Sequence, residues 1–209
     1  MSFGFSGVRL NSFERWVVGH PLRSWVQRFG DIPRLRRLAG QRAFGRTAEF
    51  GCGAGHALKH LSRLPGLTHL EAFEIDAHFF SRAKARAASL QQVTVTQADI
   101  QRISVMDSTF DSIFEFNVLH HVENWSAGIH EAGRLLRPGG VFYAQETLEG
   151  FICHPIWRRC MEHPQEKRFQ KEDFIAEAKR AGFRILGTQN WGNQFLWLAA
   201  EREERASSH

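Results

Sequence analysis

A glycine-rich loop beside a carboxylate is the stretch of this sequence best suited to bind a ligand. Glu49 precedes three glycines at alternate positions, which are Gly51, Gly53 and Gly55. Because glycine has no side chain, such a loop lets the backbone approach a nucleotide closely. A carboxylate at this position would repel a pyrophosphate at short range and would attract a cation or an ammonium group. The loop therefore indicates a nucleotide ligand that lacks phosphate and carries positive charge.

Acidic residues also end or follow the next two predicted strands. Glu74 ends the second strand, where α/β nucleotide folds place a carboxylate that accepts the ribose hydroxyls. Asp99 follows the third strand, where it or its neighbouring amide can meet an adenine edge. The glycine loop has no lysine and no Gly-Lys-Ser/Thr sequence, so it is not built for a triphosphate. These features favour S-adenosylmethionine, an adenosine ligand with a sulfonium and an amino group.

The elements that position these residues alternate between strands and helices from Arg46 onward. Strands are predicted over residues 47–50, 68–75, 93–97, 111–117 and 141–145. Helices are predicted over residues 55–64, 77–90, 126–136 and 171–181. Such alternation implies a doubly wound α/β fold with a mainly parallel sheet. Two further runs, 184–189 and 194–200, meet at Gly192-Asn193 and predict an antiparallel hairpin, which brings the sheet to seven strands.

A basic, aromatic helical lid is predicted over residues 1–45, ahead of the ligand-binding domain over residues 46–209. Ser12 is a candidate cap for a first helix, and Pro21 and Pro33 suit the first turns of two more. The aromatic residues of this segment either line an apolar pocket beneath the lid or belong to the core. They are Phe13, Trp16, Trp25 and Phe29.

Composition and charge narrow the class of protein. With 209 residues, 43% of them hydrophobic, the chain can bury one sizeable core. Its apolar runs are too short to span a membrane, no secretory signal is recognisable, and three cysteines without disulfide-like spacing indicate the cytoplasm. Residues 1–46 contain nine arginines against two acidic residues, although the net charge of the whole chain is +5. This segment suits an acidic substrate, a lipid surface or nucleic acid, or it forms a solvated helical face, so peripheral membrane contact stays open.

Taken in order, the motifs resemble class I S-adenosylmethionine-dependent methyltransferases, most of all the ubiquinone/menaquinone-biosynthesis branch. The resemblance covers roughly residues 46–150 and rests on Glu49-x-Gly51-x-Gly53-x-Gly55, Glu74, Asp99, Phe110-Asp111, residues 117–122 (NVLHHV) and residues 134–140 (RLLRPGG). It implies a Rossmann-like methyltransferase fold and S-adenosyl-L-methionine as cofactor. The cofactor-binding residues that it implies are Glu49, Gly51, Cys52, Gly53, Gly55, Glu74, Ile75, Asp99, Ile100, Asn117 and Val118.

Each part of the cofactor has an expected contact under this resemblance. Glu49 helps to organise the methionine end, and Glu74 binds the ribose. Asp99 and Ile100 lie near the adenine, and Asn117 lies near the transferable methyl group.

Two of the neighbouring residues also have structural explanations. Asp76 is better explained as a cap of the following helix than as a ligand contact. Cys52 is alternatively a small filler of the loop.

Methyl transfer from a sulfonium is an in-line displacement, which requires exclusion of water and sometimes removal of a proton. His120 and His121 lie at the mouth of the fourth strand and are the candidate bases. Paired histidines here also pack or cap a helix in the family, so both roles stay open. By fold analogy, Glu146, His154 and Trp157 face the substrate.

The leading prediction is methyl transfer to an O, N or C nucleophile of a small-molecule acceptor. Its first alternative is an RNA methyltransferase that uses the arginine-rich N-terminus. However, the fourth strand ends in Asn-Val-Leu-His and lacks the Asn/Asp-Pro-Pro-Tyr/Phe and Pro-Cys motifs of base methylation, so nucleic acid is disfavoured. The second alternative is a non-catalytic S-adenosylmethionine-binding scaffold subunit. Glu49 and the glycine spacing disfavour a nicotinamide dehydrogenase.

No metal and no oligomeric state are predicted. The only cluster with metal-ligand chemistry contains two thiols and two imidazoles, and its spacing matches no common zinc arrangement. It consists of Cys153, His154, Cys160 and His163.

Overall fold

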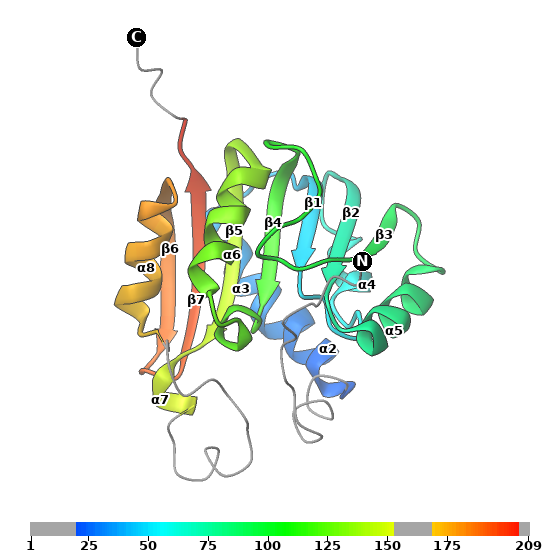
Figure 1. Cartoon of the computed structure of the whole chain (residues 1–209), viewed down its shortest axis with the longest axis horizontal. Coiled ribbons are helices and arrows are strands. Elements are labelled where there is room, and N and C mark those ends of the chain that lie inside the picture. Colours follow the sequence, from blue (N-terminus) through cyan, green and yellow to red (C-terminus); the bar gives the residue numbers. More distant parts are fainter. Residues whose placement is uncertain (1–19, 153–168, 205–209) are drawn as a thin grey trace, which may run out of the picture.

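A single seven-stranded sheet organises the chain, in the strand order β3-β2-β1-β4-β5-β7-β6 (Figure 1). The structure is a computed structural model and describes residues 20–152 and 169–204. The strands are β1 (Gly45–Phe50), β2 (Leu67–Glu74), β3 (Val93–Gln97), β4 (Phe110–Phe116), β5 (Leu136–Thr147), β6 (Phe183–Trp191) and β7 (Phe195–Arg202). Strands β1 to β5 are parallel, and β7 runs antiparallel between β5 and β6. The predicted doubly wound sheet with its C-terminal hairpin is confirmed.

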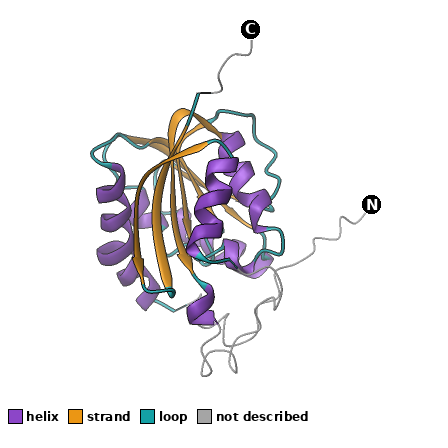
Figure 2. Ribbon diagram, turned by 90° about the vertical axis from the view of Figure 1, so that its left-hand side faces the viewer, coloured by secondary structure: helices purple, strands orange, loops and turns teal. Residues whose placement is uncertain are grey.

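Helices cover both faces of the sheet (Figure 2). One hydrophobic core contains residues of α3 (Ile32–Ala39), α4 (Leu58–Leu61) and α5 (Ala77–Ala87). The other contains residues of α6 (Trp125–Leu135) and α8 (Lys171–Arg180).

Successive strand residues point to opposite cores, as the pleat requires. In β7, Leu196 and Leu198 join the core under α6 and α8, whereas Trp197 and Ala199 join the core under α3. Both faces of the sheet are therefore buried, which is typical of doubly wound folds.

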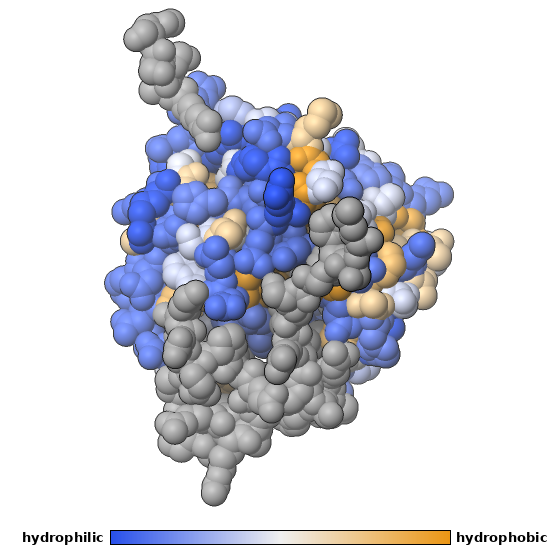
Figure 3. All heavy atoms as spheres, viewed as in Figure 1, coloured by the Kyte–Doolittle hydropathy of each residue, from blue (hydrophilic) through white to orange (hydrophobic). Residues whose placement is uncertain are grey.

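The short elements complete the fold. A helix α7 (Glu149–Ile152) follows β5, and a 3-10 helix (Leu119–His121) follows β4. None of the helices within the described ranges is both long and apolar enough to cross a bilayer. The described surface on the face shown in Figure 3 is mostly hydrophilic.

The N-terminal helical segment is continuous where two helices were predicted. Helix α2 (Leu22–Val26) runs through a π-helical stretch (Gln27–Asp31) directly into α3. Pro33 lies in the first turn of α3 and does not interrupt the segment. The wider π turn before it accommodates a residue that has no N–H to donate. Helix α3 then packs against β5, β6 and β7.

Before α3, the part of this segment from α2 through the π-helical stretch presents its apolar side to solvent and buries polar residues. Trp25 and Phe29 are 62% and 56% exposed, while Gln27 and Asp31 are buried. The expectation that Trp25 and Phe29 line a pocket or belong to the core is therefore wrong. The polar side faces inward because its side chains find hydrogen-bond partners there. One such partner is the Trp197 indole, which donates to Asp31 Oδ1 (2.9 Å). Phe13 and Trp16 lie outside the described residues.

Two element boundaries differ from the prediction for local reasons. The helix expected over residues 55–64 is limited to α4, because the glycines of the loop before it have positive φ and extend the turn. Strand β5 begins at Leu136, earlier than expected, and Pro138-Gly139-Gly140 bulges between its two pairings with β4. The predicted cap is confirmed, since the Asp76 carboxylate accepts from the N–H groups of His78 and Phe79 (2.9 and 3.1 Å).

We predict that Trp197→Phe destabilises the fold by about 1–3 kcal/mol, because it leaves the buried Asp31 carboxyl without its indole donor. Urea unfolding would measure the change. Trp191→Phe is the matched control, because Trp191 is 70% exposed and its replacement should alter stability by less than about 0.5 kcal/mol. Equal effects of the two substitutions would contradict the assigned role of the indole.

Candidate functional site

Four carboxyl groups gather where parallel strands end. Glu49 lies in β1, Glu74 ends β2, Glu115 lies in β4 and Glu146 lies in β5, and all four are buried. The carboxyl ends of parallel strands meet at one edge, which is where ligands bind in such sheets. Buried like charges repel one another, so each group needs donors, a cation or a proton.

The glycine loop after β1 has no room for side chains. A Cβ on Gly51 would lie 2.5 Å from the Val118 side chain, and one on Gly55 would lie 3.0 Å from the Ala83 backbone. Cys52 between them is buried, and its backbone N–H donates to Phe73 O (3.0 Å). Burial raises the pKa of the Cys52 thiol well above its ordinary value, so the thiol stays protonated. The predicted contact of Cys52 with a cofactor is therefore available only to its backbone.

Glu74 fixes the glycine loop to the end of β2. Its Oε2 accepts from Gly53 N–H (2.7 Å), and its Oε1 accepts from Asp76 N–H (2.9 Å). Burial raises the pKa of Glu74, and these backbone donors lower it. Each carboxylate oxygen can accept a second hydrogen bond, so the proposed contact with ribose hydroxyls remains compatible with both bonds.

The residues expected near the adenine lie at the same edge. Ile75 follows Glu74 and is half-buried, and its carbonyl accepts from Gln97 Nε2 (3.1 Å). Asp99 is half-buried, and its Oδ1 accepts from Gln101 N–H (2.9 Å). Ile100 packs into the core under α6. The assignment of these residues to adenine is a proposal.

The turn after β4 is held by side chains of β5. Asn117 has φ of 58°, a left-handed conformation that asparagine tolerates better than most residues. Its Nδ2 donates to Gln145 Oε1 (2.7 Å), and Thr147 Oγ1 donates to its Oδ1 (2.5 Å). The amide side chain is thereby fixed at the strand end.

Glu146 organises the next residues of this turn. Its Oε1 accepts from the N–H groups of Val118 and Leu119 (3.1 and 2.6 Å). Its Oε2 lies 2.6 Å from His120 Nδ1, and the centroid of the His121 ring lies 4.0 Å from that of the His120 ring, with the two rings tilted by 41°. Glu146 is fully buried, and of the two histidines it is His120 that the structure places within hydrogen-bond distance of its carboxylate.

Arg23 and Glu115 also belong to this edge, although they were absent from the predicted site. The Arg23 guanidinium of α2 donates to Phe116 O, at the end of β4. In the sequence, Arg23, Gln27 and Asp31 form a polar stripe at intervals of four residues. This spacing is the sequence signal that could have identified Arg23 as a residue facing the site. Burial lowers the pKa of Arg23, and the surrounding carboxyls raise it.

Helix α2 also contacts the glycine loop. Ser24 Oγ donates to His56 O (3.3 Å) and lies 2.8 Å from His60 Nε2. With the Arg23 bond to β4, these contacts place α2 across the edge where β1 and β4 end (Figure 1).

Glu49 has a buried carboxyl oxygen without a hydrogen-bond partner in the part of the chain that the structure describes. Among the described residues, nothing donates a hydrogen bond to its buried Oε2. Burial raises the pKa of Glu49 to about 8, against the opposing effect of Arg23, and Glu74 raises it further. A buried acceptor beside a glycine loop fits the ammonium group of an adenosyl amino acid, which would supply the missing donor.

Neither carboxyl oxygen of Glu115 has a hydrogen-bond donor among the described residues. Burial and the neighbouring Glu146 carboxylate hold its pKa well above the ordinary value, while Arg23 opposes this shift. Negative charge at the edge is therefore smaller than the number of carboxyl groups suggests.

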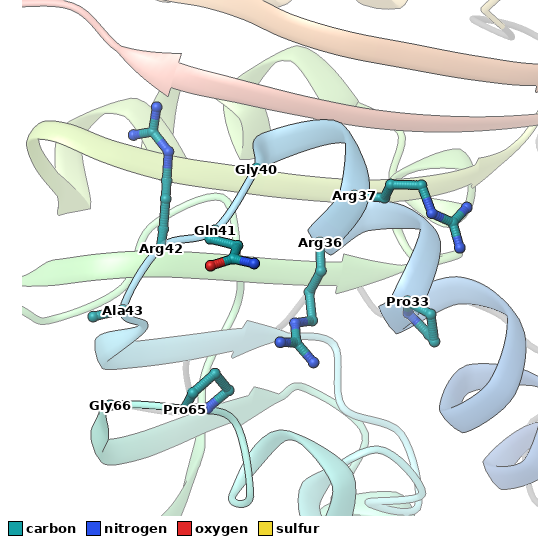
Figure 4. A pocket seen from close by; sticks show the side chains of 9 residues that line it. All are labelled: Pro33, Arg36, Arg37, Gly40, Gln41, Arg42, Ala43, Pro65 and Gly66. Atoms are coloured by element: carbon teal, nitrogen blue, oxygen red, sulfur yellow. The ribbon is translucent and has the colours of Figure 1, made fainter.

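A separate cavity of about 850 Å³ lies at the opposite edge of the sheet, near the amino ends of β1 and β2 (Figure 4). Its lining includes Arg36, Arg42, Pro65 and Gly66. The Arg42 guanidinium is paired with Glu201 (2.5 Å) and points away from Arg36. This cavity is not part of the carboxyl-rich edge.

Some residues that were predicted to belong to the site lie outside the described part of the chain. They are His154 and Trp157, together with the whole cluster from Cys153 to His163. Within the described ranges, no group of three or more metal-ligating side chains is close enough to hold an ion.

Comparison with known proteins points to one family. The sequence model of a family described as a methyltransferase domain matches residues 48–144. An uncharacterised methyltransferase of Mycobacterium bovis is 30% identical over 109 residues, which are 52% of this chain and 54% of the relative. The demethylmenaquinone methyltransferase of Staphylococcus aureus is 24% identical over 127 residues, which are 60% and 52% of the two chains. The chain spans about half the length of these curated relatives.

Among solved structures, the fold is similar to that of a phosphoethanolamine N-methyltransferase of Haemonchus contortus in complex with S-adenosyl-L-methionine. The TM-score is 0.73 at 14% identity, and the match covers 96% of this chain and 61% of that one. The family match spans the glycine loop and the ends of β1 to β4.

We predict that binding of S-adenosylmethionine at pH 7 releases a proton from Glu49. The carboxyl group has a pKa of about 8 without ligand, so it is largely protonated at pH 7, and a cationic ligand favours its ionised form. Affinity should therefore rise with pH up to about 8. Calorimetric titrations in buffers of different ionisation enthalpy would detect the released proton. Glu49→Gln should abolish the dependence of the binding enthalpy on the buffer. A wild-type binding enthalpy that does not depend on the buffer would contradict this account.

Proposed function

We propose that the chain methylates a small-molecule acceptor with S-adenosyl-L-methionine, because the sequence model of a methyltransferase domain matches residues 48–144 and the fold is similar to that of a methyltransferase solved with this cofactor. The observation that carries this proposal is the pairing of His120 with Glu146 at the end of β4 (2.6 Å). A base oriented by a buried carboxylate is suited to removing a proton from the acceptor.

The chain's own residues hold the cofactor and move the proton. When bound, S-adenosyl-L-methionine supplies a methyl group activated by its sulfonium. The residues suited to hold it are the glycine loop, Glu49 and Glu74, with Asn117 at the adjacent strand end.

His120 is the proposed proton acceptor. With Nδ1 donating to Glu146 Oε2, the imidazole keeps the tautomer whose lone pair lies on Nε2. That nitrogen takes the proton of the acceptor hydroxyl, amine or carbon acid as the nucleophile attacks. Glu146 then stabilises the imidazolium that forms, because it is buried beside the ring.

The position of α2 supports a small acceptor. Through Arg23 and Ser24 the helix contacts both the end of β4 and the glycine loop, so it covers part of the edge (Figure 1). A helix in this position restricts access for a folded nucleic acid more than for a small molecule. Membership of the quinone-biosynthesis branch is supported by motif resemblance and by the 24% identical relative. A cytoplasmic site of action remains part of the proposal.

A transfer assay tests the function. The protein would be incubated with methyl-labelled S-adenosylmethionine and a cell extract, and label would be measured separately in small-molecule, RNA and protein fractions. The proposal expects label in the small-molecule fraction, where mass spectrometry identifies the product. Label confined to RNA would support the alternative function, and cofactor binding without transfer to any fraction would support the scaffold.

We predict that His120→Ala lowers kcat by about 10²–10⁴-fold while the affinity for S-adenosylmethionine stays unchanged, because the base is removed and the cofactor contacts remain. His121→Ala is the matched control and should retain most activity, because Glu146 orients only His120 of the two. Equal losses in both variants would contradict the assignment of His120.

A further inference from the structure

Arg23 is a cation that reaches the carboxyl-rich edge without a carboxylate directly beside it. Within the described residues its hydrogen bond goes to the neutral carbonyl of Phe116, and no acidic oxygen lies within 4.0 Å of the guanidinium. A guanidinium has five N–H donors, so most of its bonding capacity remains. A charge withdrawn from water is normally paired with an opposite charge. The lack of a carboxylate beside Arg23 among the described residues therefore indicates that an anionic group of a ligand can bind there.

The neighbouring acids only partly supply an opposite charge. Burial raises the pKa of Asp31, which also accepts from Trp197. Glu49 has a pKa of about 8, and burial and the neighbouring Glu146 raise the pKa of Glu115. Glu146 is already bound to His120 and to three backbone N–H groups.

The edge therefore presents buried acceptors without a donor within the described part of the chain, at Glu49 and Glu115, and one incompletely paired cation, the Arg23 guanidinium. Glu49 is the acceptor beside the glycine loop. Its register partner on β4 is Phe114, two residues before the Phe116 carbonyl that Arg23 binds, so the two groups lie at the same strand ends. Opposite charges in this arrangement are complementary to a zwitterion, whose ammonium and carboxylate groups are joined by a single carbon.

We infer that Arg23 binds the α-carboxylate of the methionine portion of S-adenosylmethionine, while Glu49 receives its α-ammonium group. This inference rests on the proposed function, since it concerns the same cofactor. A guanidinium suits the role because its planar fork can donate two parallel hydrogen bonds to one carboxylate. The cofactor site then includes α2, which lies outside the matched domain of residues 48–144.

Paired titrations with two ligands test the inference. Wild type and Arg23→Gln would be titrated calorimetrically with S-adenosylmethionine and with its decarboxylated form, which lacks only the α-carboxylate. The wild type should bind the decarboxylated compound at least about tenfold more weakly, as expected for loss of a charged hydrogen bond. Arg23→Gln should weaken binding of S-adenosylmethionine about tenfold or more and leave the affinity for the decarboxylated compound within about threefold.

Two further variants separate recognition from folding. Arg28→Gln is the matched control, because Arg28 is exposed on the same helical segment and lies over Phe29 (4.9 Å), so neither affinity should change. Arg23→Lys keeps the charge and should restore part of the discrimination. Thermal unfolding of each variant would show that the fold is retained.

The outcomes are distinguishable. If Arg23→Gln weakens binding of both compounds by the same factor, or of neither, Arg23 does not recognise the carboxylate and the inference is overturned. A wild type that binds both compounds equally overturns it without any variant. A wild type that binds neither compound overturns the proposed function itself.

Discussion

Burial of several carboxyl groups at one edge of a parallel sheet is the constraint on which the rest of the site depends. A carboxylate withdrawn from water is costly unless donors, a cation or a proton offset its charge. The carboxyl groups at this edge are stabilised in different ways. Glu74 accepts from two backbone N–H groups, Glu146 accepts from three more and from His120, and burial raises the pKa of Glu115. Glu49 and Glu115 keep buried oxygens without a donor among the described residues, and Glu49 is the one beside the glycine loop, where a cationic ligand would supply the donor.

The same constraint explains the unusual orientation of α2 and the π-helical stretch that follows it. Their apolar side would ordinarily face the core, but their polar side faces the carboxyl-rich edge and contributes the guanidinium of Arg23. The exposure of Trp25 and Phe29 is the consequence. The arginines of this segment are thus of different kinds, because Arg23 is directed into the site whereas Arg28 lies on the surface. Helix α2 therefore packs directly against the carboxyl-rich edge.

Local signals predicted the elements well, and failed where a distant contact decided the outcome. Alternating hydrophobic runs located the strands to within a few residues, and the turn at Gly192-Asn193 and the cap at Asp76 follow from turn and capping chemistry. A separate helix was expected to begin at Pro33, but the helical segment is continuous there, because the π-helical stretch before it accommodates the proline. Burial of Trp25 was predicted from helical periodicity, which identifies two sides of a helix without saying which one faces inward.

By itself, the sequence determined the alternation of strands and helices, the glycine loop and the acids at the strand ends. These features are local, and parallel strands necessarily bring their carboxyl ends to one edge. Only the tertiary structure decided which group meets which. It paired Glu146 with His120 and left His121 beside it, and it brought Arg23 to Phe116 across 93 residues of chain. Such pairings depend on the spatial order of strands and on the rotation of helices, neither of which a linear period encodes.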